Sequence, residues 1–280
     1  MPELPEVETV RRAIAPVLEG RRIRAALVRG TGLRHPFPRD LGQSLTGRRV
    51  EGVMRRAKYL LAGIEGGATL LVHLGMSGTI RILPADGKAA GIAMGRHDHF
   101  ALQMNDGSGI VLRDPRRFGQ LDLLAPGAME TDPRLALLGP EPFDPEIDGQ
   151  WLWTRIHRSR AGIKALLMDQ RLIAGLGNIY ALEALHLARI RPTRRGCRVS
   201  RAEATRLLEA VRHVLGEAIA AGGSSIRDHR RPDGALGYFQ QTLRVYGRAG
   251  ASCLRPGCTG TIRRTVQAGR SSFHCPACQR

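Results

Sequence analysis

The amino-terminal residues are the first group in the chain that could perform chemistry. If Met1 is removed, Pro2 becomes the first residue and its nitrogen is a free secondary amine. An α-amino group titrates near pH ~8, so a fraction of it is unprotonated and nucleophilic at neutral pH. Such an amine can attack an aldehyde-like carbon to give an iminium, and Glu3 can exchange protons beside it. Many unrelated chains also begin with Met-Pro, so the dipeptide alone indicates little.

Four cysteines near the carboxyl end form a second candidate site. Four residues lie between Cys253 and Cys258, sixteen between Cys258 and Cys275, and two between Cys275 and Cys278. Two close pairs separated by the length of a hairpin can arrange four thiolates tetrahedrally around one Zn²⁺. Four thiolates leave no open position for a substrate, so we expect one structural zinc ion. The alternative is four free thiols in an unstructured tail.

The charge of the chain predicts a polyanionic partner. Lysine and arginine number 43 against 25 acidic residues, which gives a net charge of +18. Nucleic acid is the first candidate partner and an anionic membrane the second. No apolar run approaches the ~20 residues of a spanning helix, and the glutamate-rich start does not resemble a signal peptide. We therefore expect a cytoplasmic protein, in which five cysteines argue against a disulfide framework.

The basic residues are almost all arginines, and the few lysines stand out. Only Lys58, Lys88 and Lys164 are lysines. Arginine does not give up its proton in ordinary chemistry, so a lysine could mark a site that needs a titratable amine. A general drift towards arginine would explain the same composition without any function.

The elements that must position these groups differ between the two halves of the chain. Residues 2–20 have apolar positions at helical spacing, and a buried helix there would hold the amino terminus in place. Residues 21–125 contain short apolar segments between glycine-rich turns, which predict antiparallel strands in a sandwich or barrel. We expect residues 2–125 to form one domain, with the catalytic amine at its start.

The second half is predicted to be mostly helical. Residues 126–150 are rich in proline, glycine and acids and are interpreted as a linker, and residues 151–222 have helical periodicity. Ser200 and Glu203 form the pattern of a capping box at the last helix, which should stop at Gly222–Gly223. Residues 223–250 are expected to form a mobile loop region, and residues 251–280 the four-cysteine segment.

Several short motifs, in order along the chain, resemble those of the formamidopyrimidine-DNA glycosylase family. The motifs are MPELPEVETVRR, RRAKYLL, HLGMSG, DPRRFG, GLGNIYA and the four-cysteine tail, and together they cover essentially the whole sequence. The resemblance implies an α+β multidomain protein with an amino-terminal helix on an antiparallel β-sandwich. It also implies a helical helix–two-turn–helix domain and a zinc-finger β-hairpin. The family usually has two residues inside the first cysteine pair, whereas CLRPGC has four.

The resemblance also assigns roles to residues. Four residues match the catalytic group: Pro2, Glu3, Lys58 and Arg270. Arg270 matches the finger arginine that contacts phosphates at the lesion and assists the final elimination. Other positions match residues that contact DNA: His73, His97, Arg116, Arg160 and Asn178. Met76, Arg116 and Phe118 match the set that fills the void left by an extruded base. Without the resemblance, Met76 and Phe118 would be interpreted as core residues.

The activity implied is that of a bifunctional DNA glycosylase/AP lyase acting on double-stranded DNA with oxidised purines or abasic sites. It would remove 8-oxoguanine and formamidopyrimidines through a Schiff base on Pro2, then cleave the strand by β,δ-elimination. No redox or nucleotide cofactor is implied, and a monomer is expected. One alternative is an endonuclease VIII-like enzyme for oxidised pyrimidines. Another is a non-catalytic zinc-ribbon protein that only binds DNA.

Overall fold

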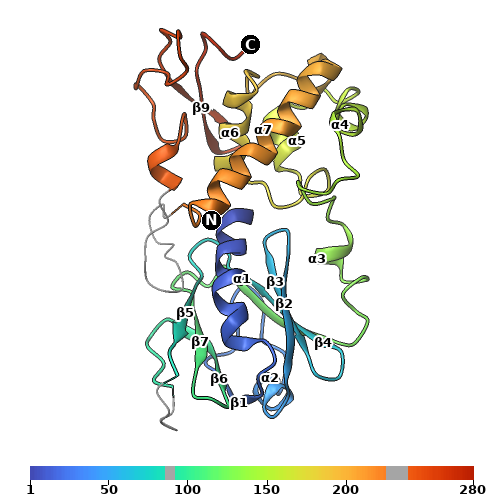
Figure 1. Ribbon diagram of the computed structural model, residues 1–280, viewed down its shortest axis with the longest axis vertical. Coiled ribbons are helices and arrows are strands. Elements are labelled where there is room, and N and C mark those ends of the chain that lie inside the picture. The colour runs from blue at the N-terminus through green and yellow to red at the C-terminus, as the bar shows by residue number, and fades with distance from the viewer. Residues whose placement is uncertain (86–91, 225–238) are drawn as a thin grey trace. The chain divides into compact units, whose positions relative to one another are not determined.

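The computed structural model describes residues 1–85, 92–224 and 239–280 (Figure 1). The chain separates into two compact units. Unit 1 contains residues 1–136 and a short segment that begins at Ala221, and unit 2 contains residues 137–220 and 239–280. The predicted boundaries at 125, 150, 222 and 250 stay predictions, and residues 225–238 of the expected loop lie outside the described residues, as does Lys88.

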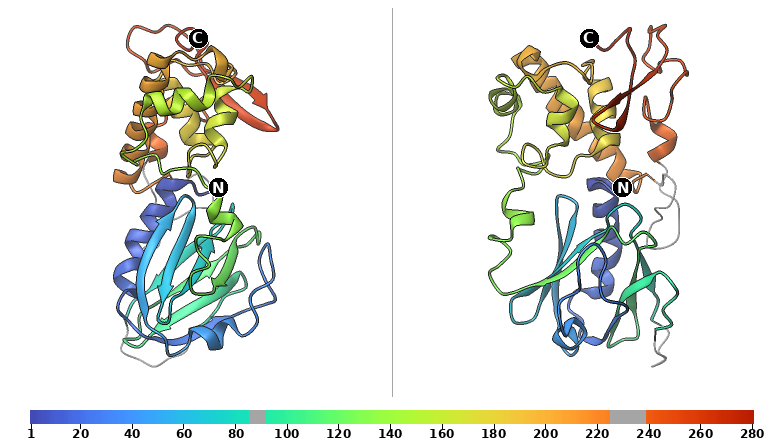
Figure 2. Two further views of the ribbon diagram at one scale, coloured as in Figure 1. Left: turned by 90° about the vertical axis from the view of Figure 1, so that its right-hand side faces the viewer. Right: turned by 180° about the vertical axis from the view of Figure 1, so that it is seen from behind.

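Unit 1 is built on two antiparallel sheets (Figure 2). Within the described residues, one four-stranded sheet has the order β1-β6-β7-β5 and the other the order β2-β3-β4-β8. The strands are β1 Ile23–Val28, β2 Val50–Arg56, β3 Tyr59–Ile64, β4 Ala68–His73, β5 Thr79–Leu83, β6 Asp98–Met104, β7 Gly109–Arg113 and β8 Gln120–Leu124. The antiparallel sandwich expected from the short apolar segments is confirmed.

Helix α1 (Leu4–Leu18) joins the core of this sandwich. Its apolar side chains, at three- and four-residue spacing, are at most 3% exposed: Val7, Val10, Ile14 and Leu18. The helix contacts β2 and β3 of one sheet and β5 and β7 of the other (Figure 1, blue). Full burial of each such side chain stabilises the fold by about 1.5–3 kcal/mol. The amino terminus is therefore attached to a well-packed helix.

Two short helices of unit 1 were not expected from the sequence. Helix α2 (Leu41–Leu45) follows β1, and α3 (Pro133–Ala136) lies inside the stretch interpreted as a linker. Each is too short to show a helical period of apolar residues. No helix in the described part of the chain is long and apolar enough to cross a membrane.

Unit 2 combines helices with one β-hairpin. Its elements are α4 Gly149–Ile156, α5 Ile163–Met168, α6 Asn178–Leu187, α7 Arg201–Ala220, the 3₁₀ turns Gly196–Arg198 and Phe239–Thr242, and the strands β9 Arg263–Gln267 and β10 Arg270–His274. Helix α7 packs against α4 and α6. The predicted capping box is confirmed, because Ser200 Oγ accepts from Glu203 N–H at 3.3 Å and Glu203 Oε2 accepts from Ser200 N–H at 2.8 Å. The helix ends just before Gly222 and Gly223, both with positive φ.

A buried carboxylate ties α6 to the chain that leads into the cysteine segment. Glu183 is 0% exposed and accepts three backbone hydrogen bonds, from Arg244 N–H at 2.8 Å and from the N–H groups of Val245 and Tyr246 at 2.9 Å each. Burial raises the pKa of Glu183, and the three backbone donors act in the opposite direction. Beside it, Leu182 and Val245 pack in one cluster with Phe273 of β10.

We expect Glu183→Gln to destabilise unit 2 strongly. The amide keeps one acceptor oxygen but turns an NH₂ group towards backbone donors, which leaves buried N–H groups without a partner. Each such group costs about 1–3 kcal/mol. Urea unfolding should show a loss of about 2–4 kcal/mol. The matched change Glu209→Gln, at an exposed position of α7, should alter stability by less than about 0.5 kcal/mol.

Candidate functional site

The amino terminus of unit 1 is fixed by a second buried carboxylate. Pro2 is buried and Glu3, the N-cap of α1, is 2% exposed. Glu6 Oε2 accepts from Glu3 N–H at 2.8 Å, while its Oε1 accepts from the N–H of Ser224 at 2.8 Å and from its hydroxyl at 3.1 Å. A Cβ at Gly223, where φ is +78°, would lie 3.2 Å from Glu6 Oε1. The start of α1 is thus held by a segment more than two hundred residues away in sequence.

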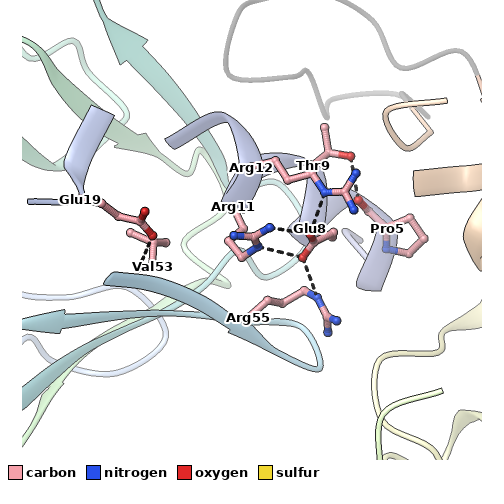
Figure 3. A network of polar contacts seen from close by, with 8 residues as sticks. All are labelled: Pro5, Glu8, Thr9, Arg11, Arg12, Glu19, Val53 and Arg55. Carbon is pink, nitrogen blue, oxygen red and sulfur yellow. Dashed lines mark hydrogen bonds and ion pairs between the residues drawn. The ribbon is translucent and has the colours of Figure 1, made fainter. Parts of the chain in front are cut away.

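Glu8 forms the next anchor, inside a group of three guanidiniums (Figure 3). Its carboxylate accepts from Arg11 at 2.8 and 3.0 Å, from Arg12 at 2.8 Å and from Arg55 of β2 at 3.2 Å. Arg55 also donates to the carbonyl of Ala57 at 3.1 Å. The Glu8 cluster (Glu8, Arg11, Arg12 and Arg55) therefore connects α1 to the turn that carries Lys58.

The charge of Glu8 is stabilised by this cluster. Burial alone raises the pKa of Glu8, but hydrogen bonds from Arg11 and Arg12 and the nearby charges of Arg11 and Arg55 outweigh burial and hold the pKa at about 2. Glu8 is thus an ionised structural residue at neutral pH and is not free to exchange protons.

Lys58 and His73 lie together at the ends of neighbouring strands. Lys58 is 7% exposed and occupies the turn between β2 and β3, next to Ala57, whose φ is +52°. Tyr59 is paired with His73 across β3 and β4, with ring centroids 4.9 Å apart. Burial, and then the charges of Lys58 and Arg34, lower the pKa of His73 to about 4. His73 is therefore neutral at pH 7, and its Nδ1 accepts from Gly75 N–H at 3.0 Å, which leaves an N–H at Nε2.

Asp114 organises the turn that carries Arg116 and Phe118. The side chain is 0% exposed and accepts from the Ser77 hydroxyl at 2.6 Å, from Gly119 N–H at 2.7 Å and from Arg116 N–H at 3.3 Å. Its backbone N–H donates to the carbonyl of His97 at 3.0 Å. The carboxylate of Asp114 thereby connects the turn after β7 to the loop of Met76, and its backbone N–H connects that turn to the predicted DNA-contact residue His97.

Met76, Arg116 and Phe118 come together on the surface of unit 1. Met76 is 45% exposed and Phe118 43% exposed, so the interpretation of both as core residues is wrong. The Arg116 guanidinium lies 4.7 Å from the centre of the Phe118 ring. A Cβ at Gly75 would lie 2.4 Å from the backbone carbon of Phe118, so only glycine permits this approach of the two loops. Two exposed apolar side chains and an arginine therefore lie together on this surface, and we call them the wedge.

In unit 2, side chains of the helices α5 and α6 bind the carbonyl of Ser271 in strand β10. It accepts from Asn178 Nδ2 at 3.0 Å and from Lys164 Nζ at 3.3 Å, and Lys164 also donates to the Ser272 hydroxyl at 2.7 Å. Asn178 opens α6 after a glycine turn that is held by Gln170, whose side chain bonds Gly175 N–H at 2.9 Å and Leu176 O at 2.8 Å. These contacts fix the strand immediately beside Arg270.

Arg270 stands at a tight and well-defined turn. Ala268 and Gly269, with φ of +48° and +72°, make the two-residue connection between β9 and β10. Burial, and then the charge of Arg270, lower the pKa of Lys164 to about 8. Lys164 and Arg270 line a cavity of about 330 Å³ together with Met168 and Gln267. Arg160, also a predicted DNA contact, is exposed in the loop between α4 and α5.

The four predicted metal ligands come together in the same unit. Their sulfur atoms all lie within 4.8 Å of one another. Cys253 and Cys278 have sulfurs 3.8 Å apart, and those of Cys258 and Cys275 are 3.6 Å apart. A tetrahedron with metal–sulfur bonds of about 2.3 Å has edges of about 3.8 Å, so this spacing suits a tetrahedral thiolate site. The cysteine spacing in the sequence predicted this cluster correctly.

The sequence did not predict the structural roles of the three buried carboxylates that support the site: Glu6, Glu8 and Asp114. Lys164 had only the weak signal that lysines are rare in this chain. Each of these residues has at least one partner that is distant in sequence: Ser224 for Glu6, Arg55 for Glu8, Ser77 for Asp114 and Ser271 for Lys164. Two of them also had a local sign, since Arg11 and Arg12 follow Glu8 at helical spacing and Glu6 stands at the capping-box position three residues after Glu3.

An amino terminus held on a β-sandwich, an exposed wedge and a hairpin beside four clustered cysteines agree with the class that the comparisons show, the DNA glycosylases of base excision repair. Two family models match: the formamidopyrimidine-DNA glycosylase N-terminal domain over residues 1–121, and the H2TH domain of the same enzymes over residues 138–230. The chain belongs to the formamidopyrimidine-DNA glycosylase family.

Full-length relatives agree with this assignment. The formamidopyrimidine-DNA glycosylase of Cereibacter sphaeroides is 53% identical, with all of both chains covered, and that of Novosphingobium aromaticivorans is 50% identical with the same coverage. Among solved structures, MutM (Fpg) from Thermus thermophilus is 41% identical with a TM-score of 0.86, covering 99% of this chain and 98% of that one. Lactococcus lactis Fpg in complex with DNA that contains an abasic site is 32% identical, with a TM-score of 0.88 and 99% of both chains covered.

The Glu8 cluster predicts a specific dependence of stability on pH. The pKa of Glu8 is about 2 in the folded chain against an ordinary value of 4.5, so its ionised form favours folding. This contribution is complete above about pH 4.5 and is lost as the pH falls towards 2. Glu8→Gln should therefore lower the free energy of unfolding by about 2 kcal/mol at pH 7, and the difference from the unaltered protein should shrink below pH 4.5.

Urea unfolding measured between pH 7 and pH 3 tests this expectation. Glu51→Gln, at an exposed position of β2, is the matched control and should track the unaltered protein. A Glu8→Gln deficit that stays constant down to pH 3 would contradict the role of the Glu8 charge.

Proposed function

We propose that this DNA glycosylase of base excision repair removes oxidised purines, chiefly 8-oxoguanine and formamidopyrimidines, and then cleaves the strand as an AP lyase. The observation that carries the proposal is the buried, hydrogen-bonded start of α1, because a catalytic amine needs a terminus that does not fray. Support for the substrate comes from solved relatives. One is MutM, 33% identical, in complex with DNA that contains carbocyclic 8-oxo-G, and others are Fpg complexes with Fapy-dG DNA.

The first chemical step would use the secondary amine of Pro2 in a chain without Met1. The nitrogen forms a bond to C1′ of the extruded nucleotide while the bond from C1′ to the base breaks, and the base leaves with its electron pair and takes up a proton. Glu3 is the nearest acid in sequence, and its carboxyl would protonate the sugar oxygen so that the ring opens to the iminium.

The second stage would be elimination. The iminium withdraws electrons from C2′, so loss of a C2′ proton expels the 3′ phosphate and a further elimination expels the 5′ phosphate. A one-nucleotide gap with phosphate ends remains. Lys58 would act on the phosphate and in proton transfer, and its small exposure beside the neutral ring of His73 supports a role close to the reacting sugar. Arg270 would hold phosphate charge at the lesion, since arginine remains protonated.

The remaining assigned residues would bind and open the duplex. His73, His97, Arg160 and Asn178 would contact the DNA backbone, with Arg116 facing the orphaned base. Met76 and Phe118 would occupy the space vacated by the extruded nucleotide. The exposure of these two apolar side chains and the Arg116 contact to the Phe118 ring support this assignment.

The cysteine cluster would hold one structural Zn²⁺, bound by Cys253, Cys258, Cys275 and Cys278. The near-tetrahedral sulfur spacing supports zinc, whose role would be to hold the β9–β10 hairpin in place of a larger apolar core. We further propose that the protein is a monomer in the bacterial cytoplasm, where the chromosome lies. Neither an oxidised-pyrimidine enzyme nor a non-catalytic zinc-ribbon protein is favoured, because the relatives are named formamidopyrimidine-DNA glycosylases.

Borohydride trapping tests the covalent step directly. With DNA that contains 8-oxoguanine opposite cytosine, borohydride should reduce the iminium and leave protein and DNA crosslinked. A form that retains Met1 should give essentially no crosslink, because its Pro2 nitrogen is an amide, and Pro2→Gly should give at least about tenfold less crosslink per unit time. Binding of each form to DNA with a non-cleavable abasic analogue is the control. Mass analysis should place the crosslink on Pro2, and efficient trapping by the Met1-retaining form would exclude this route.

Asp114→Asn tests the role of the wedge. The amide would turn a donor towards the Gly119 N–H or the Ser77 hydroxyl and loosen the turn of Arg116 and Phe118, at about 1–3 kcal/mol. Excision of paired 8-oxoguanine should fall at least about tenfold, since roughly 1.4 kcal/mol of lost transition-state stabilisation has that effect. Strand cleavage at a preformed abasic site, where no base must leave the stack, should fall less. Asp106 is exposed in the turn between β6 and β7, and its carboxylate likewise accepts from the N–H and hydroxyl of a serine, Ser108. Asp106→Asn is therefore the control and should leave both activities close to those of the unaltered protein, and equal losses on both substrates in Asp114→Asn would contradict the assignment.

A further inference from the structure

A histidine that belongs to neither the metal ligands nor the DNA-contact set lies against the cysteine cluster. His186, in the last turn of α6, is 2% exposed. Its Nε2 lies 3.3 Å from Cys253 Sγ and 4.0 Å from Cys278 Sγ. Its other ring nitrogen, Nδ1, has no hydrogen-bond partner among the described residues. The ring therefore makes its polar contacts with sulfur.

The arrangement indicates that His186 contacts a ligand of the metal and is not itself a fifth ligand. The four sulfurs lie within 4.8 Å of one another and can supply all four ligands of a tetrahedral metal, so a metal there needs no nitrogen ligand. Four thiolates around a divalent ion carry an excess of about two negative charges. An N–H group directed at this charge is favoured, whereas a bare nitrogen lone pair directed at it is repelled. The proton of a neutral ring therefore belongs on Nε2.

We propose that His186 is a positioning residue for the metal centre, whose Nε2–H donates a hydrogen bond to the Cys253 thiolate. The bond fixes the direction of this thiolate and withdraws part of its charge. Outer partners of this kind orient ligands and influence how tightly the metal is held. The inference rests on the proposed zinc ion, since the N–H group needs a thiolate to bind.

The enlarged first cysteine pair explains why the histidine stays in place. Arg255 lies between Cys253 and Cys258, and its Nη2 donates to the carbonyl of His186 at 2.6 Å and to that of Leu187 at 3.2 Å. Both carbonyls belong to the last turn of α6, where backbone acceptors are not all satisfied within the helix, and that of His186 also accepts from Arg189 N–H at 3.1 Å. Arg255 thus holds the same helical turn that carries His186, next to the sulfurs that His186 contacts.

The experiment compares zinc release from His186→Phe, His186→Gln and the control His274→Phe. His274 in β10 is also 2% exposed, and its two ring nitrogens have no hydrogen-bond partner in the described ranges, so its loss removes packing but no N–H···S bond. Zinc content is measured first in the unaltered protein. Transfer of zinc to an excess of a chromogenic chelator is then followed, and the absorption of the Co²⁺-substituted proteins is recorded.

His186→Phe should release zinc about 10–100-fold faster than the unaltered protein, with His186→Gln between them and His274→Phe close to the unaltered rate. The sulfur-to-cobalt charge-transfer band should move to longer wavelength in His186→Phe, because the thiolate no longer shares charge with a donor. Equal acceleration by His186→Phe and His274→Phe, or an unaltered rate and spectrum in both His186 variants, would overturn the inference while zinc stays bound. Absence of zinc from the unaltered protein would instead refute the proposed zinc ion.

Discussion

The start of helix α1 depends on burying acidic side chains without leaving them unpaired. Glu6 and Glu8 are both below 10% exposed, and an isolated buried carboxylate would be strongly unfavourable. Glu6 avoids this through backbone and hydroxyl donors of Glu3 and Ser224, and Glu8 through three guanidiniums. Hydrogen bonds and ion pairs have defined directions, which apolar packing lacks. These contacts therefore set the rotation of α1 about its own axis as well as how deeply the helix is buried. The proposed role of Pro2, which is to present one nitrogen to a substrate, would require such directed anchors.

The same principle recurs wherever an exposed group needs a fixed position. Asp114 is buried beneath the turn of Arg116 and Phe118, and the carbonyl of Ser271 lies beside Arg270 and accepts from two side chains. In each case the surface residue is free to meet a partner while its neighbour in the backbone is immobilised. The conformational entropy of the loop is then lost during folding, so binding does not have to overcome it again.

Much of the fold followed from local patterns in the sequence, and the support of the site did not. The segment YLLAGI is strand β3, and the Ser200–Glu203 box starts α7, because period and capping are encoded within a few residues. The cysteine spacing likewise predicted the cluster.

Glu6, by contrast, binds Ser224, 218 residues away, and Glu183 binds backbone groups more than sixty residues away. A buried acid with distant backbone partners looks the same in a sequence as a surface acid. Met76 and Phe118 show the opposite case, because an exposed apolar residue looks the same in a sequence as a core residue. The chemical roles of Pro2, Glu3, Lys58 and Arg270 stay predictions.

Helix α6 contacts the hairpin region at both of its ends. Asn178 at its first turn bonds Ser271 of β10, and His186 at its last turn lies against Cys253, about 12 Å along the helix axis. Thiolates are attacked by the same reactive oxygen species that oxidise guanine. Oxidation of the cysteines would weaken the contact at the last turn of α6, whereas the contacts of Asn178 and Glu183 would remain. The last turn of α6 is thus the part of this helix that cysteine oxidation would affect most directly.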